Sequence, residues 1–200
     1  RIGEKIEWGT FEDFMKIRGE LVKEDPSLEY DLGMLRKKTI AYHTKDFFKD
    51  TNDLNEFIEG AYNFFLGERH KVTFYDDVVS VLEELSSEYM LGVLTNGNAD
   101  INKLGIGHLF DFSISSMDVK SNKPDKGHFV KAREMSQVDF KNILHVGDHP
   151  VNDILGARDL GINTMWFNLN NLYWEIDKNP PIQFNRWSQF INLVESNYGN

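Results

Sequence analysis

The sequence predicts an α/β protein with a doubly wound parallel-sheet core and a helical cap domain. From about residue 71 onward, short apolar runs alternate with segments of helical periodicity, which is the pattern of successive strand–helix units in a parallel sheet. Before residue 71, apolar residues recur at steps of three and four without any strand pattern, which indicates amphipathic helices. We therefore predict two domains, a helical cap over residues 1–70 and an α/β core over residues 71–200.

The cap region is expected to contain several helices joined by polar turns at residues 24–27 and 49–53. Its apolar pattern is carried by Trp8, Phe11, Phe14, Ile17, Leu21, Phe57, Ala61, Phe64 and Phe65, with Tyr30, Tyr42, Phe47, Phe48 and Tyr62 nearby. Such rings can stack on a flat substrate, but aromatic residues at helical spacing are far more often part of a core. We therefore expect these side chains to be buried.

The core elements follow one another in a regular order. A helix is expected to begin after Asp76 or Asp77, which would act as its N-cap. The elements expected next are strand 90–95, helix 99–104, strand 111–115, helix 125–136, strand 142–147, helix 152–160 and strand 163–167. The tail from Asn168 is less regular, and a last helix is expected at 187–195.

Three groups of polar side chains stand at the points of the core where ligands bind in open α/β sheets. Thr95 and Asn96 end one strand, Asp148 and Asp153 follow another, and Lys123 lies in the loop between them. Lys123 lies 27 residues after Asn96 and 25 before Asp148, the rhythm of successive strand–helix units. Because the carboxyl ends of parallel strands meet at one edge of the sheet, we expect the three groups to lie together.

These residue types suit phosphoryl transfer. The Thr95 hydroxyl and the Asn96 amide can hold phosphoryl oxygens, and the Lys123 ammonium can neutralise their charge. Asp148 can hold Mg²⁺, which prefers a few carboxylate oxygens and leaves room for water and phosphate. Taken singly, each motif also has a structural explanation, since Thr-Asn-Gly is a common turn and an Asp after Gly is a common helix cap. Their order and spacing favour the functional interpretation.

The motifs resemble those of the haloacid dehalogenase superfamily of phosphohydrolases. Its second motif is matched by residues 94–97 (Leu-Thr-Asn-Gly), its third by Lys123 in Asn-Lys-Pro-Asp, and its fourth by Gly147-Asp148 with Asp153. The resemblance covers about residues 71–170 well and implies a Rossmann-like core with a helical cap. The amino-acid sequences of these motifs look most like those of flavin-pathway and FMN phosphatases.

The resemblance also implies a mechanism. An aspartate of the first motif would attack phosphorus to form an aspartyl-phosphate, and a second aspartate would serve as acid and base. Mg²⁺ held partly by Asp148 would offset the charge, while Lys123 and Thr95 would grip the phosphoryl oxygens. Asp153 would either support the metal's water ligands or pair with Lys123 and hold its ammonium in place.

The first motif, Asp-x-Asp on the first strand, does not occur in this sequence. The nearest carboxylate pairs are Asp76 with Asp77 and Asp50 with Asp53, and neither follows an apolar strand. In the family's strand order the missing strand lies between the strand ending at Thr95 and the one ending at Gly147. We therefore expect the natural polypeptide to carry that strand upstream of Arg1.

The amino-acid composition limits the classes of binding partner. A formal charge of −10 and a pI near 5.0 argue against nucleic acid or an anionic membrane, because both are polyanions that bind basic surfaces. Small phosphorylated metabolites remain, since a local cationic site can work within an acidic surface. The chain has no cysteine, so disulfides and thiol chemistry are excluded. With neither a long apolar run nor a signal peptide in this sequence, we expect a cytoplasmic monomer or weak dimer.

The six histidines show no zinc-site spacing. His145 is expected to be a neutral residue within a strand, and His149 to face water in the loop after Asp148. The function predicted from the sequence is a Mg²⁺-dependent phosphatase acting on a small phosphomonoester, such as a flavin-pathway nucleotide or a sugar phosphate. Three alternatives remain open: a haloacid dehalogenase, a phosphomutase, and a non-catalytic binding protein without the nucleophile.

Overall fold

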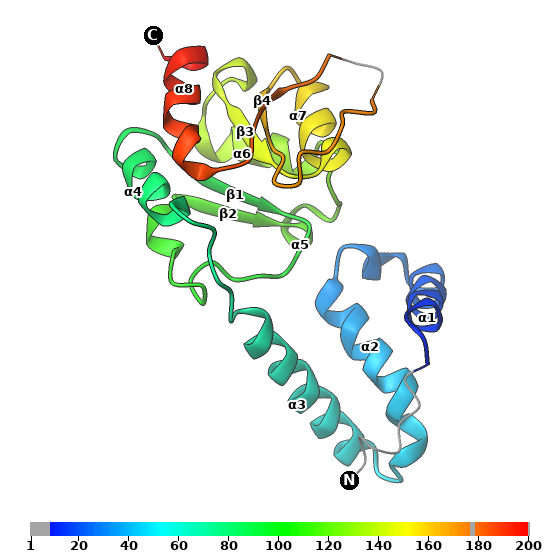
Figure 1. Ribbon diagram of the computed structural model, residues 1–200. Coiled ribbons are helices and arrows are strands. Elements are labelled where there is room, and N and C mark those ends of the chain that lie inside the picture. Colours follow the sequence, from blue (N-terminus) through cyan, green and yellow to red (C-terminus); the bar gives the residue numbers. More distant parts are fainter. Residues whose placement is uncertain (1–8, 177–178, 200) are drawn as a thin grey trace. The chain divides into compact units, whose positions relative to one another are not determined.

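The computed structural model describes residues 9–176 and 179–199 and divides into two compact units (Figure 1). The first unit holds the chain up to Lys71 together with Gly97–Asp100. The second unit holds Val72–Asn96 and the chain from Ile101 onward. Gly97–Asp100, which follows the first strand of the second unit, thus belongs to the first unit. Local sequence patterns do not predict this assignment.

The described part of the first unit contains three α-helices, α1 (Phe11–Glu24), α2 (Leu32–Thr44) and α3 (Thr51–Arg69), with short 3₁₀ turns at Pro26–Glu29 and Lys45–Phe47. Each helix begins at a side-chain cap. Thr10 and Asp13 form a capping box before α1, while Asp31 and Asp50 accept backbone N–H bonds at the starts of α2 and α3. These caps satisfy N–H groups that have no partner within the helix.

The aromatic residues of the first unit are less buried than the sequence predicts. Phe11 and Phe64 are 77% and 71% exposed, so the expectation of a core position was wrong for them. Tyr42 and Phe47 are also exposed, and Trp8 lies outside the described residues. The buried positions described in this unit are taken by the aliphatic residues Leu28, Leu35 and Ile58 and by Thr39 and Thr44. Three packed helices bury only a narrow apolar stripe on each helix. Residues outside that stripe face water even where they recur at helical spacing.

The second unit alternates strands and helices as predicted. Its main elements are α4 (Val78–Glu88), β1 (Gly92–Thr95), β2 (Phe112–Ser115), α5 (Ser116–Val119), α6 (Gly127–Ser136), β3 (Leu144–Gly147), a π-helical turn (Pro150–Leu155), α7 (Gly156–Arg158), β4 (Asn163–Phe167), β5 (Ile182–Phe184) and α8 (Phe190–Tyr198). Short 3₁₀ turns lie at Gly107–Leu109, Phe140–Asn142 and Trp187–Gln189.

Four details differ from the sequence prediction. Residues 99–104 are not a helix but run into a turn that closes at Gly105, whose φ of +80° ends any helical path. The helix expected at 152–160 is a π-helical turn followed by the very short α7. Strand β5 was missed because three residues are too few to show an alternating pattern. Asp77 stands at the N-cap of α4, but its side chain makes no capping bond.

The strands form two parallel sheets, which agrees with the predicted fold class. One sheet pairs β1 with β2, placing Leu94 opposite Ile114, and the other has the order β3–β4–β5, placing Val146 opposite Met165. The sequence predicts that a strand absent from these residues lies between β1 and β3, and within the described residues β1 and β3 indeed belong to separate sheets with no strand joining them. The carboxyl ends of β1 and β3 nevertheless supply the predicted residues of one site.

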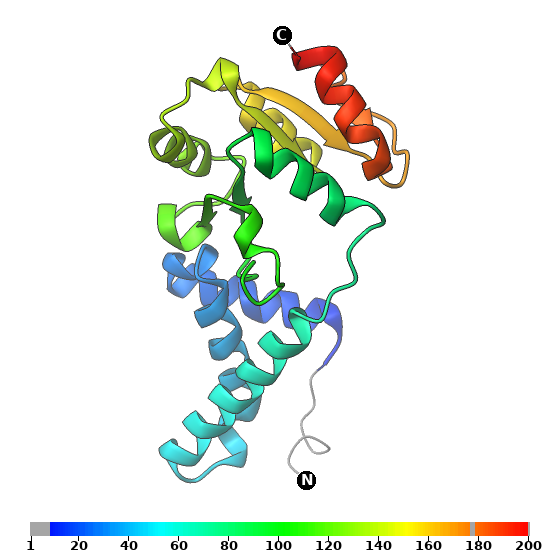
Figure 2. The same ribbon diagram turned by 90° about the vertical axis from the view of Figure 1, so that its left-hand side faces the viewer.

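Helices cover both faces of the three-stranded sheet. On one face, α4 and α8 share a hydrophobic cluster with Met165 and Phe184 of β4 and β5, and Figure 2 shows both helices beside these strands. A second cluster joins Phe129 of α6 to Ala157 of α7 and to Ile162. Layers on both faces are the arrangement of a doubly wound core. Each face of β3 therefore meets a different set of helices.

The described helices are not membrane-spanning elements. A span requires about 20 mainly apolar residues. The longest helix described, α3, has 19 residues and carries charged side chains along its length. Within residues 9–176 and 179–199, no helix combines the length and the apolar character that a bilayer crossing demands.

Candidate functional site

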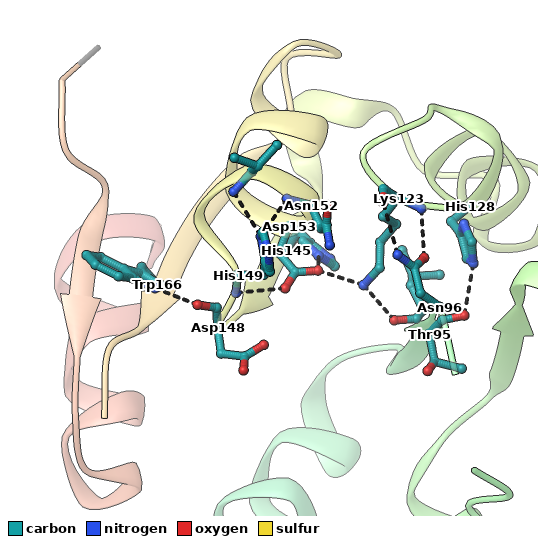
Figure 3. A network of polar contacts seen from close by, with 12 residues as sticks. Thr95, Asn96, Lys123, His128, His145, Asp148, His149, Asn152, Asp153 and Trp166 are labelled. Atoms are coloured by element: carbon teal, nitrogen blue, oxygen red, sulfur yellow. Dashed lines mark hydrogen bonds and ion pairs between the residues drawn. The ribbon is translucent and has the colours of Figure 1, made fainter. Parts of the chain in front are cut away.

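The second unit brings the five predicted site residues to the ends of β1 and β3 (Figure 3). Thr95 is the last residue of β1, and Asn96 follows it. Asp148 comes directly after β3, and Asp153 lies in the π-helical turn behind it. Lys123 precedes α6 and reaches toward both strand ends. Four of the five enter one polar network, and Asp148 stands at its margin.

Lys123 and Asp153 form a buried ion pair. The Lys123 ammonium lies 2.6 Å from Asp153 Oδ1 and donates a second bond of 2.8 Å to the carbonyl oxygen of Leu94. The two side chains are only 9% and 8% exposed. Of the two contacts that the sequence left open for Asp153, the structure contains the pairing with Lys123. The ammonium therefore links the end of β1 to the turn after β3.

Asn96 holds the backbone of Lys123. Its side-chain amide donates to the carbonyl oxygen of Lys123 at 2.9 Å, and its Oδ1 accepts the Lys123 backbone N–H at 2.7 Å. The amide oxygen is thus already engaged within the protein. The sequence assigned this amide to phosphoryl oxygens, whereas in the structure its role is to fix the loop that carries the ammonium.

Asp153 accepts hydrogen bonds on both carboxylate oxygens. Besides the Lys123 ammonium, Oδ1 faces His145 Nε2 at 3.3 Å, and Oδ2 accepts the backbone N–H of His149 at 3.1 Å. Burial by itself raises the pKa of the Asp153 carboxyl, but the hydrogen bond from His145 and the charge of Lys123 outweigh burial and hold that pKa well below its usual range. The carboxylate is therefore ionised at neutral pH.

Gly147 is required by the close approach of the turn to β3. A Cβ atom at this position would overlap the side chain of Asp153. Only glycine lets the last residue of β3 lie against the carboxylate that holds Lys123. The Gly-Asp step recognised in the sequence therefore has a packing reason in addition to any role of Asp148.

Thr95 is held at the end of β1 by a histidine that the sequence analysis did not select. The carbonyl oxygen of Thr95 lies 3.1 Å from Nε2 of His128, a fully buried residue of α6. Burial lowers the pKa of His128, and the bond to Thr95 opposes that shift only in part. Since a neutral imidazole can donate from Nε2, His128 fixes the strand end without adding charge. No spacing in the sequence links these two positions.

Asp148 is exposed at the end of β3. Its carbonyl oxygen accepts a bond of 2.9 Å from the indole N–H of Trp166, and its carboxylate points away from the Lys123–Asp153 pair (Figure 3). Among the described residues, no three His, Asp or Glu side chains are grouped to hold a metal ion. Mg²⁺ is often held by one or two carboxylates with water and phosphate. Asp148 fits one such ligand position, and this chain's described residues do not supply a full set.

The two neighbouring histidines have structural contacts. His149 is exposed, and its Nδ1 accepts the backbone N–H groups of Val151 and Asn152 at 3.2 and 3.1 Å. Its ring therefore caps the π-helical turn. His145 lies inside the unit, where burial lowers its pKa against the raising effect of Asp153. The sequence placed His145 on a strand but did not connect it with Asp153.

Comparison with known proteins matches most of the chain to one family. The model of the haloacid dehalogenase-like hydrolase family matches residues 14–167. The Escherichia coli 5-amino-6-(5-phospho-D-ribitylamino)uracil phosphatase YigB is 24% identical over 187 residues, which cover 92% of this chain and 79% of that protein. A glyceraldehyde 3-phosphate phosphatase from Pyrococcus abyssi is 37% identical, but over 84 residues that span only 35% of its length.

Solved structures share the fold over nearly the whole chain. The 2-haloacid dehalogenase of Pseudomonas syringae pv. Tomato has a TM-score of 0.88 and 32% identity, covering 94% of this chain and 82% of that one. The Bacillus subtilis hydrolase YfnB, solved with bound magnesium, has a TM-score of 0.63 and 18% identity, with coverage of 94% and 84%. At that identity, the likeness to YfnB concerns the fold alone.

Proposed function

The chain belongs to the haloacid dehalogenase-like hydrolase family, and we propose that it is a Mg²⁺-dependent phosphatase of a small phosphomonoester. The family resemblance predicted from the motifs is thereby confirmed. The observation that carries the proposal is the buried Lys123 ammonium, held between Asp153 and the end of β1. A fixed cation beside a strand end is the group that a transferring phosphoryl needs.

The geometry of Lys123 supports binding of a phosphoryl oxygen. An ammonium has three N–H donors, and within the described residues two of them are directed at Asp153 and Leu94. One N–H therefore remains for a ligand. Because the ammonium is already held by the protein, it would neutralise developing charge without first having to be ordered.

The reaction follows the family's chemistry. A carboxylate oxygen attacks phosphorus, the bond from phosphorus to the ester oxygen breaks, and a second carboxylic acid gives its proton to the leaving alcohol. Water, deprotonated by that second group, then releases phosphate. No Asp-x-Asp occurs in this sequence, so we place both carboxylates on a segment outside these 200 residues. Bound Mg²⁺ would supply charge neutralisation beside Asp148.

The residues of this chain then have separate tasks. Lys123 holds the phosphoryl oxygens, Asn96 fixes the Lys123 backbone, and Asp153 keeps the ammonium in place. His128 fixes the carbonyl group of Thr95, whose side chain we assign to the same phosphoryl group. Asp148 offers its exposed carboxylate to the metal.

For the substrate we propose a flavin-pathway nucleotide or a sugar phosphate. The E. coli relative, similar over 92% of this chain, acts on a phosphorylated ribitylaminouracil. A glyceraldehyde 3-phosphate phosphatase is similar over 40% of this chain. A small metabolite also suits an acidic protein of net charge −10, which we expect to be a cytoplasmic monomer or weak dimer.

Phosphate release by the natural polypeptide tests the proposal. The substrates would be p-nitrophenyl phosphate, FMN and a panel of sugar phosphates, with and without Mg²⁺. Lys123→Ala should lower turnover by about two or more orders of magnitude. The matched control is Lys131→Ala, which removes an exposed lysine of the same region and should leave turnover unchanged. Near-normal turnover by a folded Lys123→Ala protein would refute the assignment.

A second candidate is a 2-haloacid dehalogenase, favoured by the 32% identity to the Pseudomonas protein over 94% of this chain. The same attacking carboxylate would then displace halide from carbon. Such a reaction needs no metal, so halide release from 2-chloropropionate in the presence of EDTA, without phosphate release from any ester, would select it. Turnover of neither substrate class would favour the non-catalytic alternative. Transfer of phosphate between positions of one sugar would identify a phosphomutase.

A further inference from the structure

We propose that His145 is a positioning residue that orients the Asp153 carboxylate and, through it, the Lys123 ammonium. Only the last step, from an oriented ammonium to phosphoryl binding, rests on the proposed function. His145 belongs to β3, and its imidazole faces the Asp153 carboxylate of the buried ion pair (Figure 3). No contact of His145 with a substrate or a metal ion is part of the proposal.

Strand alternation places the imidazole on the side of the ion pair. Leu144 and Val146 pack into the cluster formed with α8, so His145 between them faces the opposite side of β3. There the ring of Phe129 meets it edge to face, at a centroid distance of 5.1 Å and an interplanar angle of 88°. The ring is thus held by a strand on one side and an aromatic contact on the other.

The hydrogen bond defines the tautomer. His145 Nε2 lies 3.3 Å from Asp153 Oδ1, the same oxygen that accepts the Lys123 ammonium at 2.6 Å. A carboxylate only accepts, so Nε2 must carry a proton. Because burial lowers the pKa of His145, we assign the neutral form protonated at Nε2. The imidazole then donates to Asp153 without adding a second cation beside Lys123.

Three hydrogen-bond donors hold the two oxygens of the Asp153 carboxylate. The backbone N–H of His149 holds Oδ2, while Lys123 and His145 both hold Oδ1. Without the imidazole, Oδ1 would be held by the lysine alone, whose side chain has four rotatable bonds. The carboxylate would gain freedom to rotate, and the ammonium would move with it. An apolar side chain could fill the space of His145 but could not donate this bond.

The test compares His145→Gln with His145→Leu. The amide nitrogen of glutamine can reach the place of Nε2 and donate, whereas leucine fills space without a donor. His108→Leu, at an exposed histidine of the same unit, is the matched control. The first readout is the acetylation rate of Lys123, measured by peptide mass spectrometry with exposed Lys131 as the internal reference. This readout requires no enzyme activity.

We expect the acetylation rate of Lys123 to rise about fivefold or more in His145→Leu, as expected for loss of a hydrogen bond to a charged group, and to stay near wild type in His145→Gln and His108→Leu. On an Asp153→Asn background the His145→Leu change should add little, since the carboxylate through which it acts is gone. Any of three results would overturn the proposal. The Lys123 acetylation rate could be equal in wild type and His145→Leu, or it could change equally in the leucine and glutamine variants. Alternatively, the effects of His145→Leu and Asp153→Asn on that rate could be fully additive in the double variant.

Turnover separates this proposal from the proposed function. If Lys123 grips the phosphoryl group, kcat on p-nitrophenyl phosphate should fall about tenfold in His145→Leu, about 1.4 kcal/mol of activation free energy, and recover in His145→Gln. If instead Lys123→Ala leaves turnover intact, the proposed function fails, and the acetylation rates still decide whether His145 orients the pair.

Discussion

Replacing Asp153 by asparagine should cost the second unit much of its stability. Asp153→Asn keeps the size of the side chain but leaves the Lys123 ammonium, only 9% exposed, without its counter-charge. Removal of one partner from a buried ion pair costs about 3–5 kcal/mol. A domain of ordinary stability has only about 5–15 kcal/mol in total. We therefore expect the urea midpoint of this unit to fall substantially at neutral pH.

The pH dependence follows from the sign of the pKa shift. The pKa of Asp153 is lower in the folded protein than in the unfolded chain, where it is about 3.9. The stability that this ionisation contributes is complete above that value and is lost as the pH falls from it toward the folded pKa. The difference between wild type and Asp153→Asn should therefore be largest at neutral pH and shrink below about pH 4.

The assay is urea unfolding followed by tryptophan fluorescence. Three of the four tryptophans, Trp166, Trp174 and Trp187, lie in the second unit, so on a Trp8→Phe background the emission reports on that unit. The matched control is Asp139→Asn, which breaks the exposed ion pair with Arg133 and should cost at most about 1 kcal/mol. Two results would refute the assignment of Lys123–Asp153 as a buried and strongly coupled pair. Asp153→Asn and Asp139→Asn could lower the free energy of unfolding equally at neutral pH, or the difference between wild type and Asp153→Asn could grow as the pH falls.

Three further predictions concern the site and the sheet. Asp148→Asn should lower Mg²⁺ affinity about tenfold or more in calorimetric titration of the natural polypeptide, without changing its melting temperature because the side chain is exposed; unchanged affinity would remove Asp148 as a ligand. Gly147→Ala should destabilise the second unit by about 1–3 kcal/mol, seen as a lower urea midpoint, because its Cβ overlaps Asp153; an unchanged midpoint would contradict that packing. We also predict that a strand carrying Asp-x-Asp pairs with β1 and β3, since unpaired strand edges inside a core are costly; the natural protein should then exceed 23.2 kDa by intact-mass measurement, and a folded protein of that mass alone would count against it.

The sequence alone determined the fold class and selected most of the residues that meet in the candidate site. Apolar runs at regular spacing imply parallel strands, and parallel strands bring their carboxyl ends to one edge. This pattern predicts that Thr95, Lys123 and Asp153 lie together, and the structure places them at the ends of β1 and β3. Periodicity carries this information because it is local, repeated and independent of how individual side chains pack.

Tertiary structure decided which atoms meet. The Asn96 amide binds the Lys123 backbone 27 residues away, and His145 and His128 join the network through single contacts. It also decided that aromatic rings such as Phe11 face water. Such contacts depend on rotamers and on the packing of elements far apart in the chain, which no local pattern encodes. The sequence pattern therefore predicts which residues form the candidate site, while the hydrogen bonds that hold Lys123 depend on the folded structure.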